Sequence, residues 1–298
     1  EGTIKAEKGS ALLATGQNIL MQPKGKDKIF IRSDLNKHMP ENKDTAIIHN
    51  GKIEALKTEI KVYGNPYAHA IKLKGEIKSS SIVKKDGKIL LVADGGKIDI
   101  EDKISGKNSP IEIVAEKVSI YKNAIIKTDK ENQISISAFK IYNEGKIESP
   151  FGDIILQSNL DKSFCMNVGE INTSSNNGGK ISITTDRYFN SGKITSEGID
   201  GLGGEINICY KDNFIETQNS KLSVFSANNK AGFINVHSRD KGRLFTYGNH
   251  NASGKYSGKI HLMGNDINLI AANIEANGKN GGEILIGGDY QGKNDGFV

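Results

Sequence analysis

The chain has 298 residues, of which 34 are Gly, 5 are Pro and none is Trp, and 25% are charged. This composition excludes a collagen-like chain and a disordered low-complexity chain. The absence of any run of 18 apolar residues excludes a membrane-spanning helix. The net charge of +5 comes from 40 basic and 35 acidic residues that are closely interleaved, which indicates a solvated surface rather than a groove for nucleic acid.

A short phrase, Gly followed by any residue and then Ile, recurs along the chain from Gly2 to Gly282. Between Gly204 and Gly282 the phrase returns in steps of 28, 26 and 24 residues. A period near 25 residues is typical of a solenoid, in which each repeat forms one turn that packs on the next.

Residues 23–45 interrupt this repeat near the beginning of the chain. The stretch contains the polar run "SDLNKHMPENKDT" and lacks alternation of apolar and polar residues. We therefore expect residues 23–45 to leave the coil as a loop.

Apolar residues alternate with polar ones after each Gly, which predicts short strands with one buried face rather than helices. The clearest examples are "KISIT" (180–184), "EINIC" (205–209), "FINVH" (233–237), "KIHLM" (259–263) and "EILIG" (283–287). The loops between strands vary in length whereas the strands do not, which favours parallel stacking over hairpins. The pattern predicts an all-β parallel β-helix of about 12 rungs of roughly 25 residues, in which each Ile lies above the Ile one turn before.

The residue between Gly and Ile is expected to point outward, and its charge changes sign along the predicted stack. It reads Lys180, Glu205, Phe233, Lys259 and Glu283. Opposite charges on stacked neighbours attract by about 0.2 to 1 kcal/mol per pair, so this order agrees with parallel stacking.

We expect residues 1–298 to form a single continuous β-helix, with loop excursions near 23–45 and 237–257. The chain begins with Glu1 and ends with the apolar pair Phe297 and Val298. These ends predict that it is a fragment of a longer protein.

Three phrases carry a resemblance to a known family. "GTIKAEKGSALLATGQNILM" (2–21), "NPYAHAIKLKGEIKS" (65–79) and "NGGEILIGGDYQGKN" (280–294) resemble the filamentous haemagglutinin family of bacterial exoproteins. The resemblance implies a right-handed parallel β-helix that is exported through a dedicated outer-membrane partner, the two-partner secretion route, and that takes part in adhesion. The Asn-Pro-Asn-Gly motif of the family's secretion module is missing, so we expect this segment to lie beyond that motif.

Binding residues are expected on a loop near 237–257, because loops on a rigid scaffold commonly carry function. The candidates for this site are Arg239, Arg243, His250 and Tyr256. A merely longer solvated corner is the simpler interpretation of the same residues.

Some β-helices cleave polysaccharides, with clustered Asp pairs or with Lys or Arg beside calcium-binding carboxylates, so catalytic residues are sought among the carboxylates. The candidates are Asp99, Glu101 and Asp102, with Asp186 beside Arg187. Outward charges on any strand give the same pattern, so we predict no enzymatic activity.

Cofactor and metal sites are not expected. The six His residues have no ligand-like spacing, and Cys165 and Cys209 lie 44 residues apart without a Cys-x-x-Cys motif. We predict that both cysteines are unpaired.

The sequence therefore favours a secreted or cell-surface bacterial adhesin scaffold, with an outer-membrane transporter as its partner in export and a cell-surface glycan or protein as its receptor. Nucleic acid is not an expected partner. Two alternatives stay open, the stalk of a contact-dependent toxin and a β-helical polysaccharide-degrading enzyme.

Overall fold

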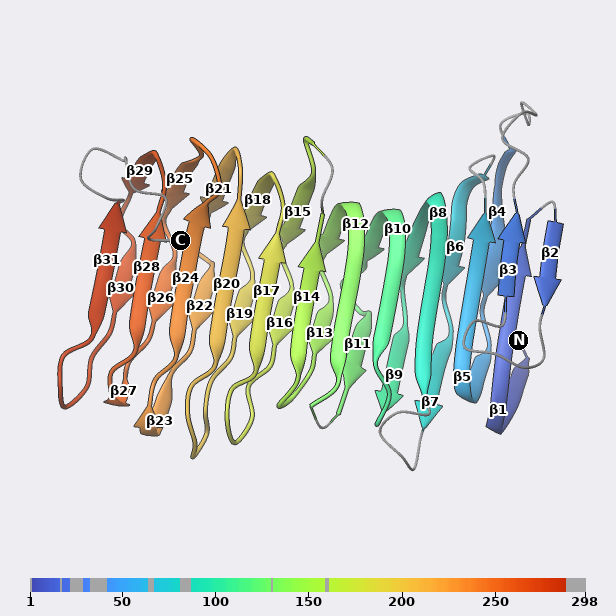
Figure 1. Cartoon of the computed structure of the whole chain (residues 1–298), viewed down its shortest axis with the longest axis horizontal. Helices are drawn as coiled ribbons and strands as arrows, with labels where there is room; N and C mark the ends of the chain where they lie inside the picture. The colour runs from blue at the N-terminus through green and yellow to red at the C-terminus, as the bar shows by residue number, and fades with distance from the viewer. Residues whose placement is uncertain are drawn as a thin grey trace. The chain divides into compact units, whose positions relative to one another are not determined.

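The computed structural model describes residues 2–16, 18–21, 29–32, 42–63, 67–80, 87–129, 131–158 and 161–287. None of the described residues is helical, so no described segment forms a helix that could cross a membrane. The chain divides into two compact units, Glu1–Lys146 and Ile147–Val298, and Figure 1 shows the strands of each unit stacked side by side.

Unit 1 is built from long strands, several of which bend from one face of the coil to the next. Its strands are β1 (Thr3–Thr15), β2 (Asn18–Met21), β3 (Ile29–Arg32), β4 (Asn42–His49), β5 (Lys52–Tyr63), β6 (Tyr67–Leu73), β7 (Glu76–Ser80), β8 (Lys88–Ile100), β9 (Lys103–Lys107), β10 (Ile111–Ile120), β11 (Ile125–Thr128) and β12 (Gln133–Asn143). Strand β13 (Lys146–Glu148) contains the boundary between the units. Within unit 1, β5 pairs in parallel with β1, β7 and β8, and β10 pairs in parallel with β8 and β12.

Unit 2 is built from shorter strands separated by corners. Its strands are β14 (Asp153–Gln157), β15 (Phe164–Asn167), β16 (Glu170–Asn172), β17 (Lys180–Thr184), β18 (Arg187–Asn190), β19 (Lys193–Thr195), β20 (Glu205–Tyr210), β21 (Asn213–Glu216), β22 (Lys221–Ser223), β23 (Ser226–Lys230), β24 (Phe233–Ser238), β25 (Arg243–Thr246), β26 (Asn249–Asn251), β27 (Gly254–Tyr256), β28 (Lys259–Met263), β29 (Asp266–Leu269), β30 (Asn273–Glu275) and β31 (Glu283–Gly287).

The strands of unit 2 form three parallel ladders, which we call the first, second and third ladders. The first contains β14, β17, β20, β24, β28 and β31, the second contains β15, β18, β21, β25 and β29, and the third contains β16, β19, β22, β26 and β30. Each turn contributes one strand to each ladder, and β23 and β27 form a further parallel pair at a corner.

The core is a set of stacked side chains inside the coil, aliphatic for the most part, as predicted, together with the buried rings of Tyr188, Tyr210 and Phe214. In the first ladder the residues in register are Ile154, Ile181, Ile206, Ile234, Ile260 and Ile284. The first five are fully buried, whereas Ile284 on the last strand is 41% exposed because no later described strand covers it. Burying an Ile side chain contributes about 1.5 to 3 kcal/mol, so the stack is the main source of stability.

The parallel β-helix is thus confirmed, but the number of turns is not. The described residues contain about 9 turns of roughly 24 residues, fewer than the 12 predicted, because part of the chain lies outside the parallel strand pairing. One such part is the antiparallel pair of β2 and β3.

The two predicted loop excursions have different outcomes. Most of residues 23–45 lies outside the described residues, apart from β3 and the start of β4. The stretch 237–257 contains β25 and β26, which continue the second and third ladders in register, and β27 at the corner. Regular strands therefore occupy much of the region in which an excursion was expected.

Candidate functional site

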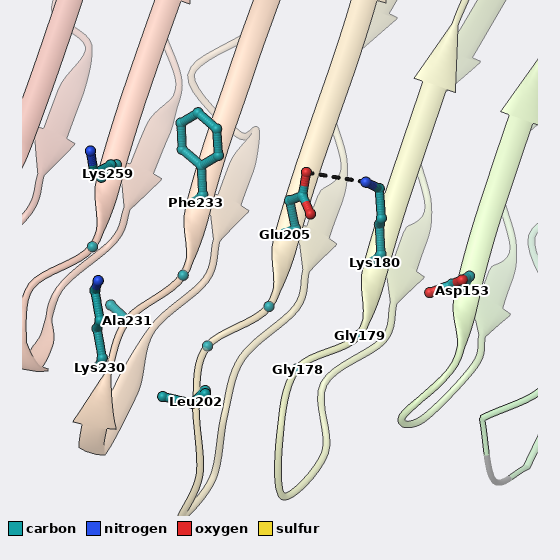
Figure 2. A pocket seen from close by; sticks show the side chains of 14 residues that line it. Asp153, Gly178, Gly179, Lys180, Leu202, Glu205, Lys230, Ala231, Phe233 and Lys259 are labelled. Atoms are coloured by element: carbon teal, nitrogen blue, oxygen red, sulfur yellow. Dashed lines mark hydrogen bonds and ion pairs between the residues drawn. The ribbon is translucent and has the colours of Figure 1, made fainter.

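A groove of about 670 Å³ follows one corner of unit 2, where the chain enters the first ladder. Figure 2 shows the groove with the outward residues at the start of the ladder on one side and Leu202, Lys230 and Ala231 on the other. Its lining residues are Asp153, Gly178, Gly179, Lys180, Leu202, Gly203, Gly204, Glu205, Lys230, Ala231, Gly232, Phe233, Gly258 and Lys259.

The floor of the groove is formed by backbone, because there is no room for a side chain at its glycines. A Cβ atom added to Gly232 would lie 1.8 Å from the carbonyl oxygen of Gly204, and one added to Gly204 would lie 2.1 Å from that of Gly179. The repeated Gly therefore allows one turn to lie directly on the next, and the groove is a consequence of that close approach.

The wall of the groove carries charges of alternating sign and one aromatic ring. Lys180 Nζ lies 3.2 Å from Glu205 Oε1 one turn away (Figure 2), and Lys259 Nζ lies 3.1 Å from Glu283 Oε2. Between these pairs stands Phe233, whose ring meets the ring of His261 edge to face at a centroid distance of 4.7 Å.

The carboxylate of Glu283, beside the groove, has two side-chain partners, Lys259 and His261. Its Oε1 lies 2.6 Å from His261 Nε2, and hydrogen bonds from His261 and then Lys259 lower the pKa of Glu283. The arrangement of ammonium groups, carboxylates and an aromatic ring suits an elongated polar ligand that also has an apolar face.

The four predicted binding residues do not share one surface. His250 in β26 points into the coil, where its Nε2 lies 2.5 Å from Glu216 Oε2 and both side chains have 0% exposure. Arg239 forms an ion pair with Asp186, which is buried. Arg243 is exposed on β25, and Tyr256 is 41% exposed on β27.

The three carboxylates of "KIDIEDK" each have a local partner. Asp99 is buried and accepts a hydrogen bond from the hydroxyl of Tyr121 at 3.4 Å. Glu101 forms an ion pair with Lys72 at 3.1 Å, and Asp102 accepts a hydrogen bond from the backbone N–H of Lys103 at 2.8 Å. All three therefore have contacts that stabilise the coil.

The pair Asp186 and Arg187 is divided between the inside and the outside of the coil. Asp186 is buried and accepts hydrogen bonds from the backbone N–H groups of Lys162 and Ser163. Arg187 is exposed, with its guanidinium carbon 5.9 Å from the centre of the Phe164 ring.

Metal-ligating residues do not gather in the described part of the chain, where no group of three His, Cys, Asp or Glu side chains could hold an ion. Cys165 and Cys209 are both free, as predicted. Burial raises the pKa of the Cys165 thiol to about 12, so this thiol is unreactive at neutral pH.

Sequence reasoning missed a chain of buried polar side chains inside the second ladder. Asn167 donates to Asn190 at 2.9 Å, Asn190 donates to Glu216 Oε1 at 3.1 Å, and Thr246 donates to Glu216 Oε2 at 2.8 Å. Each of these residues is the last of its strand. The sequence carries one sign of this chain. The stretches "FCMN", "RYFN", "NFIE" and "RLFT" each end in a polar residue.

No protein-family model matches this sequence, and no curated protein matches it by sequence. Among solved structures, the fold is similar to the crystal structure of the HMW1 secretion domain from Haemophilus influenzae, with a TM-score of 0.56 and 15% sequence identity. The match covers 82% of this chain and 91% of that domain. At this identity the likeness establishes the β-helical fold.

Proposed function

We propose that this chain is a β-helical segment of a secreted or cell-surface bacterial exoprotein, exported by the two-partner route through an outer-membrane transporter. The main observation in favour is the structural match, which spans 91% of a domain described as a secretion domain. The resemblance of residues 2–21 and 280–294 to the filamentous haemagglutinin family supports the same conclusion.

The fold suits passage through a pore followed by folding outside the cell. In a parallel coil each turn contacts only its neighbours, so folding can begin at one place and propagate turn by turn. The stacked Ile residues supply the driving force locally. A chain of this kind can fold as it emerges, without waiting for distant segments.

In the exported protein, the segment would act as a scaffold that displays outward side chains to a receptor. The groove beside Lys180, Glu205 and Phe233 supports this role, because charges and an aromatic ring can contact a cell-surface glycan or protein. In this proposal the segment performs no enzymatic step.

Export is tested by expressing the chain behind a secretion signal in a bacterium, with and without its cognate outer-membrane transporter. Although the Asn-Pro-Asn-Gly motif is missing, the match spans 91% of a secretion domain, so in this proposal the chain carries its own export signal. We expect the chain in the medium only when the transporter is present, and in the periplasm otherwise. An unrelated periplasmic domain behind the same signal is the control. Retention of the chain in the periplasm despite the transporter would contradict the proposal.

Adhesion is tested separately, by comparing cell binding of the full-length secreted protein with and without this segment. We expect deletion to reduce binding. Equal binding by the two forms would remove the adhesive role and leave the export role intact.

A further inference from the structure

The second ladder of unit 2 carries an apolar stripe on its outer surface. The residues in register at its centre are Met166, Phe189, Ile215 and Phe245, which we call the apolar stripe. All four point outward, since the residues on both sides of each along its strand are buried. Ile215 is 38% exposed.

An apolar run over four consecutive turns occurs on the outer surface of the second ladder alone among the three. The central outward residues of the first ladder are polar over four consecutive turns, Ser182, Asn207, Asn235 and His261, with Ile155 before them and Leu285 after them. The outward residues that end the strands of the third ladder include Asn172, Thr195 and Asn251. An exposed apolar patch bordered by polar residues marks an interaction surface more often than bare scaffold.

The border of the stripe is positively charged on one side. The neighbouring outward column contains Phe164, Arg187, Asn213 and Arg243 in register, and Asp266 at its end. Arg187 and Arg243 are both exposed and stand two turns apart. On the opposite border lie Val168 and Tyr247, which are exposed and uncharged.

The spacing of the stripe matches an α-helix laid along the stack. Successive turns of the coil are about 4.8 Å apart, and one turn of an α-helix rises about 5.4 Å. A helix in this direction therefore presents one side chain to each turn of the coil, from positions such as i, i+4, i+7 and i+11. Acidic residues seven apart on its flank would meet Arg187 and Arg243, which are separated by about two strand spacings.

We propose that the apolar stripe is a docking surface for an amphipathic helix of a partner protein, with acidic residues along the flank that faces Arg187 and Arg243. Charge complementarity selects an acidic partner. An added strand is a poorer occupant, because strands add at an edge with unpaired backbone groups, whereas the stripe lies on the face of a ladder. A second copy packed with its stack reversed would bring together two columns that each carry two arginines and one carboxylate, Asp266, so positive charge would be left unmatched.

The probe is a fluorescein-labelled helical peptide of 15 residues, held by a side-chain lactam bridge, with Leu at positions i, i+4, i+7 and i+11 and Glu along one flank. Its binding to the whole chain is measured by fluorescence anisotropy. We expect saturable binding, and little binding of a peptide in which each flanking Glu is Lys. No saturable binding, or equal binding of the Lys peptide, would overturn the proposal.

Two variants locate the site, each with a matched control on another surface. Ile215→Ser and Arg243→Glu are expected to weaken binding by about tenfold or more, as loss of a central anchor or of a facing charge does. Ile199→Ser removes an apolar side chain that is 64% exposed at a corner, and Lys193→Glu reverses an exposed charge on the third ladder. These controls should bind as the unmodified chain does, and equal loss in variant and control would also overturn the proposal. Urea unfolding of each variant verifies that the coil is intact.

Discussion

Glu216 and His250 form a carboxylate–imidazole pair within the coil, with 2.5 Å between Oε2 and Nε2 and no exposure of either side chain. They come from successive ladders, 34 residues apart, and His250 occupies a position where its neighbours in register are Leu222 and Ile274. Asn190 and Thr246 complete the hydrogen bonds of the carboxylate. A polar contact therefore joins two faces of the coil at a point where apolar packing is the rule.

Replacing His250 by Leu should destabilise the coil although Leu suits the apolar neighbours. The substitution leaves the Glu216 carboxylate buried without its imidazole partner, which costs about 3 to 5 kcal/mol. The measurement is urea unfolding followed by circular dichroism. The double variant Glu216→Gln with His250→Leu removes the buried charge and keeps an amide near Asn190 and Thr246, so it should recover part of the loss. A single variant as stable as the unmodified chain would show that the pair contributes nothing.

Stability should also fall with acid in a way that depends on Glu216. Burial raises the pKa of Glu216, but attraction to His250 and hydrogen bonds from His250, Asn190 and Thr246 outweigh it, so the pKa lies below the ordinary 4.5. The group binds a proton more weakly when folded, so its contribution is present above pH 4.5 and is lost as the pH falls through the folded pKa.

The pH effect is measured as the difference in unfolding free energy between the unmodified chain and Glu216→Gln. That difference should shrink as the pH falls below 4.5. Other carboxylates titrate in both proteins and cancel in the subtraction. A difference that does not change down to pH 3 would contradict the assignment.

Adding one methyl group at Gly232 should disrupt the stack. The Cβ of Ala at this position would lie 1.8 Å from the carbonyl oxygen of Gly204, and backbone on the adjacent turn cannot rotate away as a side chain could. We expect Gly232→Ala to lose about 3 kcal/mol or more, in the range of severe core changes. The matched control is Gly281→Ala, where a Cβ meets nothing within 4 Å, and which should change stability by less than about 0.5 kcal/mol. The prediction fails if the two variants unfold at the same urea concentration.

The two cysteines should differ in their reaction with iodoacetamide. Cys165 is fully buried and its pKa is raised to about 12, whereas Cys209 is only partly buried. Because the thiolate is the reacting form, mass spectrometry of the native chain should find Cys209 modified first. In a Cys209→Ser variant, Cys165 should react only as fast as the coil opens, and urea should accelerate it. Rapid modification of Cys165 in the native chain would show that the interior is accessible.

The stacking of the coil could be predicted from a small number of residues in the sequence. Ile181 and Ile206 lie 25 residues apart within the same phrase, and the structure places them in register. Alternation fixes which face of a strand is apolar, and Gly marks the corner at which one turn meets the next. Both patterns can be recognised from residues close together in the sequence, so no knowledge of distant contacts is needed.

The polar interior could not be predicted in the same way. His250 belongs to "GNHNASG", a stretch that is typical of a loop because its one aliphatic residue is Ala252. In the structure His250 nevertheless lies in register with Leu222 and Ile274. The alternation of inward and outward side chains starts anew after every corner, and the corners differ in length. The sequence alone therefore does not say which side chain of a strand points inward.

The sequence by itself determined that this protein is a parallel coil with Ile inside and Gly at its corners, because a period of two within a period near 25 is compatible with little else. Only the tertiary structure decided which columns run along each face, since register across a corner depends on backbone hydrogen bonds between turns. Those bonds bring His250 onto Glu216 in the interior, and they align Phe189, Ile215 and Phe245 on the surface.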